Sequence, residues 1–447
     1  RIMPKAKKAG GKKKKATKGS KKNGGGNSTT EIKTTPYIIS GRESCICPRL
    51  GEAYHRSSHV EEIKSSLAIT AIRKAIESSS DALDVAGCAI SVIPRRLISN
   101  EYLRQEIVCL NLARNRLYDS ELAFEALCEL KVLRRLDLRG NDLVGKLSEK
   151  AGRLHLLEEV HLDDNHLTGL PTSCCQWKNL QVFTASKNSL KALPDGVKQW
   201  SNLRECNVRS NELTTLPDAI YNWTKLETLF AANNKLKSLP LDFGNNMTSL
   251  KKLELTGNEL EDLPENMLSH CAATMVYLNL ASNRLTTLPT KLFTTHSTLR
   301  ELQLYRNRLT DLPPSIKNLA HLTRLSVSNN KLKTFPEELG DCASLRELYA
   351  NYNATLSELP FSMGRLTRLE ELALRGNPKL KFLPSSMTRC EELKHLDLRI
   401  VGTGAGKKEV CKLAPELREV LGGLKCVVRG GVSKKGKGAA GKGKKKK

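Results

Sequence analysis

The chain contains 447 residues, carries a formal net charge of +26 and has only 4% aromatic residues. It has no run of eighteen apolar residues and no apolar signal segment near its start, which argues against a membrane-spanning or secreted protein. Its thirteen cysteines are odd in number and scattered, so we expect reduced thiols and a cytoplasmic location, with a nuclear one also open.

Two segments, residues 1–35 and residues 429–447, are predicted to be disordered, Lys/Gly-rich tails. The first holds 12 basic residues against one acid, and the second holds nine basic residues and no acid. Together they contribute +20 of the +26 charge, and they contain too few apolar residues to form a core. Met3 is the expected start of translation.

The lysine clusters of both tails suggest contact with a polyanion, such as RNA or anionic lipid. They lack the interleaved aromatic residues that stack on bases, so binding would be blind to sequence. A solubilising, targeting or nuclear-localising role fits the same composition, and both interpretations stay open. The candidate polyanion-binding residues are Lys12, Lys13, Lys14, Lys15, Lys444, Lys445, Lys446 and Lys447.

Residues 36–80 are predicted to form a linker and a capping helix. From Val60 onward, Ile63, Leu67, Ala71 and Ile72 recur at helical spacing, which indicates an amphipathic helix. A solenoid needs such a cap, because its first repeat has no neighbour to cover its apolar side.

The pattern LxxLxLxxNxL recurs through residues 81–428. Its twelve clear copies are 23 to 26 residues apart, and two degraded copies, with Cys88 and Val401 at the Asn position, flank them. This period and consensus are typical of leucine-rich repeats. The sequence therefore predicts an α/β solenoid: a curved horseshoe with a parallel inner sheet, an irregular or helical convex side and a C-terminal cap. The asparagines are Asn115, Asn141, Asn165, Asn188, Asn211, Asn234, Asn258, Asn283, Asn307, Asn330, Asn353 and Asn377.

Most of the conspicuous residues are accounted for by this frame. Each frame asparagine is expected to hydrogen-bond backbone groups that stacking would otherwise bury unpaired. Trp177, Trp200 and Trp223 each stand eleven residues before a frame asparagine, so they are predicted to lie in the core of the convex side. Cys342 and Cys390 occupy the same position and are predicted to be small buried hydrophobes.

No motif in the sequence predicts catalysis, a cofactor, a metal site or a small-molecule substrate. The stretch VGTGAGKKEV at 401–410 lacks the spacing and the hydroxyl of a phosphate-binding loop. Cys45 and Cys47 precede His55 and His59, but one intervening residue between cysteines is wrong for a zinc site. The chain is therefore predicted not to be an enzyme.

The outward positions of the strands are the candidate partner-binding surface. They lie six, four, two and one residues before each frame asparagine, and in the later repeats they gain Tyr and Arg. These residue types dominate protein-interface hot spots, although pairing across neighbouring strands would also explain them. The candidate residues are Phe230, Tyr277, Tyr305, Arg306, Arg324, Tyr349, Arg375 and Arg399.

Three stretches, LTTLPDAIYNWTKLETL, LTDLPPSIKNLAHLTRLSVSNNKLKTFPEELG and LSELPFSMGRLTRLEELALRGNPKLKFLPSSM, carry a resemblance to a known family. The chain resembles the intracellular Ras-group leucine-rich repeat proteins: the Ras-suppressor protein, the Scribble and Erbin repeat domains, the plant Ras-group-related proteins and the lysine-tailed Ras–Raf scaffold. The resemblance implies a non-enzymatic scaffold in intracellular signalling whose concave face binds a Ras-type GTPase or a phosphatase. The alternative is an RNA- or ribosome-associated protein bound through its basic tails.

Overall fold

The computed structural model describes residues 58–293, 297–399 and 427–429, all of which belong to one unit of the chain, Pro48–Lys447. Both lysine clusters, the Cys45–His55 region and the stretch at 401–410 lie outside the described residues. The proposed boundaries of the tails and of the repeat domain therefore stay predictions.

A fifteen-stranded parallel sheet runs the length of this unit, and its strands follow one another in chain order with β4 and β6 left out. Each strand spans three residues, and each pairs residue for residue with the next, as Leu302 does with Leu325 and Leu325 with Leu348. The strands are β1 (Ala82–Asp84), β2 (Cys109–Asn111), β3 (Arg135–Asp137), β5 (Glu159–His161), β7 (Val182–Thr184), β8 (Glu205–Asn207), β9 (Thr228–Phe230), β10 (Lys252–Glu254), β11 (Tyr277–Asn279), β12 (Glu301–Gln303), β13 (Arg324–Ser326), β14 (Glu347–Tyr349), β15 (Glu371–Ala373), β16 (His395–Asp397) and β17 (Val427–Arg429).

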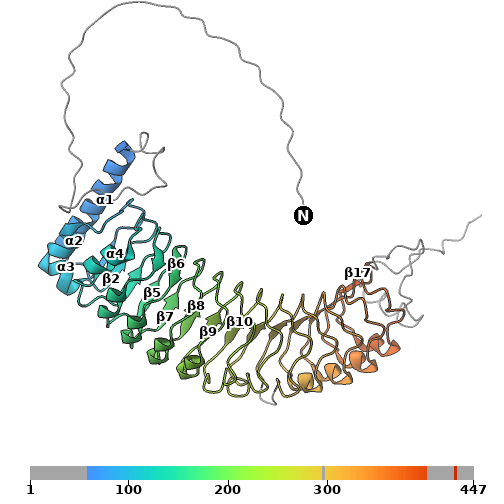
Figure 1. Cartoon of the computed structure of the whole chain (residues 1–447). Coiled ribbons are helices and arrows are strands. Elements are labelled where there is room, and N and C mark those ends of the chain that lie inside the picture. The colour runs from blue at the N-terminus through green and yellow to red at the C-terminus, as the bar shows by residue number, and fades with distance from the viewer. Residues whose placement is uncertain (1–57, 294–296, 400–426, 430–447) are drawn as a thin grey trace, which may run out of the picture. The chain divides into compact units, whose positions relative to one another are not determined.

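Within this unit the strands line the inner side of the curve, and short helices line its outer side (Figure 1). The central residue of each strand of this fifteen-stranded sheet from β1 to β16 is buried, because alternate side chains of a strand point to opposite sides. A further short parallel sheet joins β4 (Val144–Lys146) to β6 (His166–Gly169). The predicted leucine-rich repeat solenoid is thus confirmed.

The frame asparagines bond consecutive repeats together. Asn307 donates from Nδ2 to the carbonyl oxygens of Leu280 (2.9 Å) and Leu304 (3.0 Å), and its Oδ1 accepts from the N–H of Leu285 (3.1 Å). One buried side chain therefore satisfies backbone groups of two repeats, as the sequence predicts.

The outer side carries 3-10 helices, and most of them follow a proline that cannot donate to the sheet. Trp177, Trp200 and Trp223 are fully buried beneath them, and neighbouring rings stack with centroids 6.1 Å apart. The prediction of a core position is confirmed for all three. The helices are η2 (Glu149–Arg153), η3 (Thr172–Gln176), η4 (Asp195–Gln199), η5 (Asp218–Asn222), η6 (Pro314–Asn318), η7 (Glu337–Asp341), η8 (Phe361–Arg365) and η9 (Ser385–Arg389).

The tryptophans and cysteines of this position share a role that was not predicted. Trp200 Nε1 donates to the carbonyl of Cys174, 26 residues earlier, at 3.0 Å. Cys342 and Cys390 are buried as expected, and their thiols donate in the same way to the carbonyls of Ile316 and Met363. Both residue types therefore provide a donor toward the preceding repeat.

The N-terminal end is capped by α1 (Ser58–Glu77), which packs against β1, and by α2 (Arg95–Ser99) and α3 (Glu101–Glu106); α4 (Ser120–Leu127) follows β2. The predicted helix is present, but one of its expected core residues is wrong. Leu67 is 54% exposed; the helix buries Ile72, as predicted, together with Ala68 and Ala75. None of the described helices is long and apolar enough to cross a bilayer.

Candidate functional site

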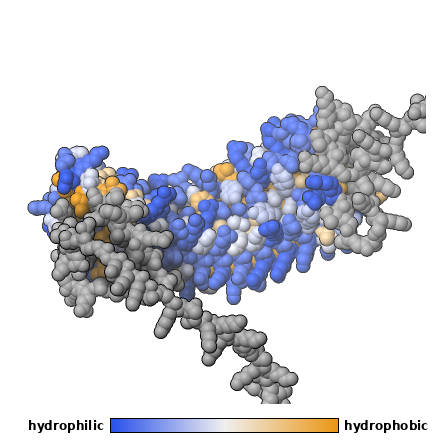
Figure 2. Space-filling model, turned by 90° about the horizontal axis from the view of Figure 1, so that it is seen from above, coloured by the Kyte–Doolittle hydropathy of each residue, from blue (hydrophilic) through white to orange (hydrophobic). Residues whose placement is uncertain are grey.

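The candidate site is the strand face, defined as the side chains six, four, two and one residues before each frame asparagine. Figure 2 looks onto the inner side of the unit and shows a mainly hydrophilic surface with scattered apolar spots. Only the first two of these positions lie within the strands, since Glu301 and Gln303 belong to β12 whereas Tyr305 and Arg306 follow it. The last two positions project from the turn that ends the strand.

The residue directly before the frame asparagine adopts a left-handed conformation in all twelve clear repeats. Arg306 has φ +56° and Tyr352 has φ +57°, a region that residues other than Gly, Asn and Asp seldom occupy. At the same position, a Cβ on Gly376 would meet the Tyr352 ring at 2.5 Å. The repeat frame predicts a surface position for these residues, but nothing in the sequence indicated their backbone geometry.

Phe230 and Tyr277 are half-buried on neighbouring parts of the strand face. The Arg209 guanidinium lies over the Phe230 ring at 3.8 Å from its centroid, and the same guanidinium is paired with Glu254. The Tyr277 hydroxyl accepts a hydrogen bond from Asn279 Nδ2 at 3.0 Å. Burial raises the Tyr277 pKa, so its phenol remains protonated at neutral pH.

A ladder of paired side chains crosses β12 to β15. Arg324 lies between two acids, with Nε 2.8 Å from Glu347 Oε2 and Nη1 3.9 Å from Glu301 Oε1. The Tyr349 hydroxyl donates to Glu347 (2.8 Å) and lies 3.0 Å from Glu371 Oε2. Burial, together with these two carboxylates, raises the Tyr349 pKa. Arg324 and Tyr349 thus already have partners within the protein.

The C-terminal end of the face carries two arginines, of which one is ion-paired with a described residue and the other is not. Arg399 binds Asp397 through Nε (2.9 Å) and Nη2 (2.5 Å). Arg375 makes no ion pair with a described residue; its guanidinium carbon lies 5.7 Å from the Tyr352 ring centroid, and its Nε is buried without a hydrogen-bond partner. Its neighbour Ala373 is small and buried. Arg375 therefore retains hydrogen-bond donors that no described residue uses.

Three further residues of the face make no side-chain hydrogen bond or ion pair with a described residue. Tyr305 is half-buried, Arg306 is exposed, and both were predicted from the sequence. Lys252 on β10 was not among the predicted residues, although its frame position assigns it to the same surface. It lies in register with Tyr277 on the next strand.

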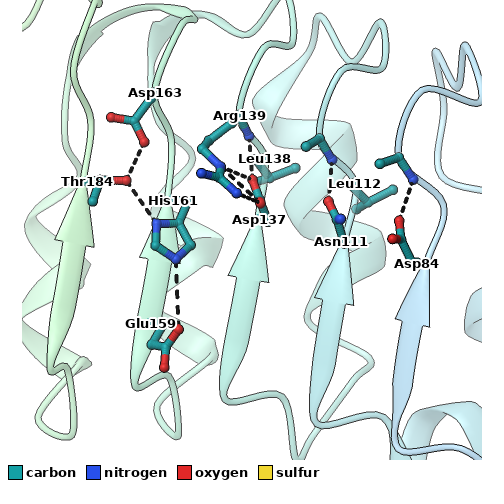
Figure 3. Close-up of polar contacts among 12 residues, drawn as sticks. Asp84, Asn111, Leu112, Asp137, Leu138, Arg139, Glu159, His161, Asp163 and Thr184 are labelled. Carbon is teal, nitrogen blue, oxygen red and sulfur yellow. Dashed lines mark hydrogen bonds and ion pairs between the residues drawn. The ribbon is translucent and has the colours of Figure 1, made fainter.

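The N-terminal end of the face is polar and internally bonded (Figure 3). His161 Nδ1 lies 2.9 Å from Thr184 Oγ1, Thr184 donates to Asp163, and His161 Nε2 lies 3.8 Å from Glu159. Arg139 pairs with Asp137. Asp84 and Asn111 accept the N–H two residues ahead, which ends their strands in an Asx-type turn. All of these residues except Asp163 and Thr184 border a shallow hollow of about 290 Å³. Most of their polar groups are hydrogen-bonded or ion-paired with one another.

Within the described part of the chain, no group of three or more His, Cys, Asp or Glu side chains could hold a metal ion. The described cysteines form no disulfide with one another, and burial raises the pKa of Cys342 and Cys271 to about 12, which suppresses the reactive thiolate. The arrangement of the strand face is suited to binding through hydrogen bonds, ion pairs and aromatic contacts.

The fold is that of a leucine-rich repeat protein. Two repeat models agree: one described as "Leucine rich repeat" matches residues 297–354, and one described as "Leucine Rich repeats (2 copies)" matches residues 224–266. No curated protein matches the chain.

Among solved structures, the chain is similar to the leucine-rich repeat protein LIC12759 of Leptospira interrogans, with 27% identity, a TM-score of 0.60 and coverage of 80% of this chain and 97% of that one. The ectodomain of the Arabidopsis thaliana receptor kinase GASSHO1/SCHENGEN3, in complex with CASPARIAN STRIP INTEGRITY FACTOR 2, has 27% identity and a TM-score of 0.55 over 70% of this chain and 40% of that chain. The Drosophila Toll–Spatzle complex has 25% identity and a TM-score of 0.59 over 69% of this chain and 42% of that chain. The repeat fold is generally a protein-interaction scaffold, and two of these structures are complexes.

Proposed function

We propose that the chain is a non-enzymatic scaffold that binds a folded protein on its strand face and acts in intracellular signalling in the cytoplasm. The observation that supports this proposal is the set of half-buried tyrosines and unpaired cations, including Tyr305, Arg306 and Arg375, on a sheet fixed by buried asparagines. A rigid sheet presents these groups without the entropic cost of ordering a loop.

The resemblance to the Ras-group proteins suggests a Ras-type GTPase or a phosphatase as the partner. Titration of the full chain with a purified Ras-type GTPase, loaded in turn with GDP and a GTP analogue, tests the first possibility. Saturable binding that depends on the nucleotide supports it, and the absence of heat or anisotropy change for both forms contradicts it.

The experiment that tests the general proposal compares proteins captured by three full-length chains. These are the parent, a variant with Tyr305→Ala and Arg306→Ala, and a variant with Lys12 to Lys15 and Lys444 to Lys447 all replaced by Ser. A partner of the strand face is retained by the tail variant and lost from the face variant. A partner set that follows only the tails contradicts the proposal.

A second candidate function is association with RNA or ribosomes, or with anionic lipid, through the tails. It is favoured by the uneven charge, since residues 1–35 and 429–447 hold +20 of the net +26. Contacts of this kind weaken steeply with salt and, for RNA, disappear on nuclease treatment. Partners that survive both treatments favour the strand face instead.

A further inference from the structure

The C-terminal half of the strand face, from β10 to β16, carries five cations, and they fall into two groups. Arg324 is paired with Glu347, and Arg399 is paired with Asp397. The other three, Lys252, Arg306 and Arg375, make no ion pair with a described residue.

The acids of the same half are already occupied. Glu254 is paired with Arg209, and Glu301 accepts from Gln303 Nε2 at 2.7 Å. Glu347 is ion-paired with Arg324, and Asp397 is ion-paired with Arg399. Glu371 accepts a hydrogen bond from the Tyr349 hydroxyl. The surface therefore has unused cationic donors and few unused carboxylates.

Each of these three cations has a tyrosine adjacent to it in strand register, in the chain or in space. Lys252 is the register partner of Tyr277, Arg306 follows Tyr305 in the chain, and the Arg375 guanidinium lies 5.7 Å from the Tyr352 ring centroid. A cation next to an aromatic ring can pair with a carboxylate while the ring excludes water from the contact.

We infer that this half of the strand face recognises an acidic segment of the protein partner, whose carboxylates pair with Lys252, Arg306 and Arg375. This inference rests on the proposed protein-binding function and specifies the chemistry of its partner. Lys252 lies on β10 and Arg375 lies just after β15, so the two are five strand steps or roughly 24 Å apart. Arg306, in the turn after β12, lies between them. A chain segment of about seven extended residues spans that distance.

A discrete acidic peptide fits this pattern better than a nucleic acid. Nucleic-acid strands place a phosphate at every nucleotide, so charge would be continuous along the face. Glu301, Glu347 and Glu371 lie between the cations, so a continuous phosphate backbone would have to pass over them, whereas a peptide can place neutral residues there and carboxylates only opposite the cations. The basic tails of the chain itself are also unsuited as occupants, because they carry the same sign as the unpaired cations.

The test is a selection of random 12-residue peptides displayed on phage against the full chain, followed by anisotropy measurements on the recovered peptides. The face variant carries Lys252→Glu, Arg306→Glu and Arg375→Glu. The control variant carries Lys178→Glu, Lys198→Glu and Lys317→Glu, three exposed lysines near or in the outer helices, which change the net charge equally. Both variants keep both tails, so binding to the tails cancels in the comparison.

We expect the recovered peptides to be enriched in Asp and Glu. They should bind the face variant at least tenfold more weakly than the parent, and they should bind the control variant as tightly as the parent. Acidic peptides that bind all three proteins equally would overturn the inference, as would their displacement from the face by poly(U) RNA. Neutral or basic peptides that lose affinity only for the face variant would overturn the acidic specificity and leave the proposed function standing. If no recovered peptide binds the face variant more weakly than the parent, the result would count against both the acidic specificity and the proposed function.

Discussion

The Glu149 carboxylate accepts the backbone N–H of Ser173 in the next repeat, with Oε2 3.0 Å from the nitrogen. It also accepts the N–H of Thr172 and pairs with Lys146 at 2.8 Å. Glu149, which lies in η2, thus caps the N-terminus of η3 in the next repeat. The same relation recurs between Glu337 and Ser362.

This cap predicts acid-sensitive stability. The Lys146 hydrogen bond, followed by the contacts to Ser173 and Thr172, lowers the Glu149 pKa from 4.5 to about 2. Because the pKa is lower in the folded state, the stabilisation is complete above about pH 4.5 and is lost as the pH falls toward 2. Glu149→Gln should lower the free energy of unfolding at pH 7 by at most about 1 kcal/mol, since the side chain is half exposed.

Thermal unfolding of the parent and Glu149→Gln between pH 7 and pH 3 measures this effect. The difference in Tm should narrow below pH 4.5, and Glu106→Gln, an exposed acid without a partner among described residues, should show no such difference. A constant difference across the range would show that the carboxylate charge does not stabilise the helix.

Replacing a frame asparagine with alanine should destabilise the protein far more than replacing a surface asparagine. Asn307→Ala leaves the N–H of Leu285 and the carbonyl of Leu280 without their side-chain partners. A loss of about 2–4 kcal/mol in the free energy of unfolding is expected. Asn266→Ala, at an exposed position whose side chain makes no hydrogen bond with a described residue, should change it by less than about 0.5 kcal/mol in the same urea titration.

Trp200, the middle one of the three stacked tryptophans, should contribute more to the free energy of unfolding than Trp177. Trp200 stacks on both Trp177 and Trp223 and lies 5.0 Å from Phe183, whereas Trp177 stacks on one tryptophan. Trp200→Leu should therefore destabilise the protein by about 1 kcal/mol more than Trp177→Leu. Equal losses would indicate that volume alone, and not ring stacking, decides the effect.

Arg306→Gly separates backbone strain from binding. Glycine tolerates φ +56° without a steric penalty, so the variant should be as stable as the parent or more stable by up to about 1 kcal/mol. It should bind the partner more weakly because it lacks the guanidinium. A large drop in Tm would mean that the Arg306 side chain supports the fold.

Periodicity predicted the solenoid well because each frame position has one environment. The buried leucines, the asparagine contacts and the core position of the tryptophans follow directly from the 23-to-26-residue repeat. Outside that frame the prediction weakened. Leu67 was assigned to the packed side of α1, whereas the buried residues Ala68, Ile72 and Ala75 follow i, i+4, i+7 spacing, which places Leu67 beside the packed stripe and leaves it exposed.

The strand face was harder to predict. The repeat places Glu301, Arg324 and Glu347 at the same frame position, so their neighbourhood could be foreseen, but the choice of partner depends on side-chain conformation. The sequence left open whether these side chains pair within the protein, and only the structure shows that Arg324, Tyr349 and Arg399 do. Only the structure shows, too, that Lys252 and Arg375 make no ion pair with a described residue. The left-handed residue before each asparagine gave little signal, because Gly, Asn and Ser share the position with Arg, Lys and Tyr.

The most direct measurement is the affinity of the main captured protein for the parent and for the double variant Tyr305→Ala, Arg306→Ala, by titration calorimetry, with Tm recorded for both. We expect a loss of about 100-fold or more in affinity with an unchanged Tm, since these side chains make no hydrogen bond or ion pair with a described residue. Undiminished affinity of the double variant would contradict the assignment of the strand face as the binding surface.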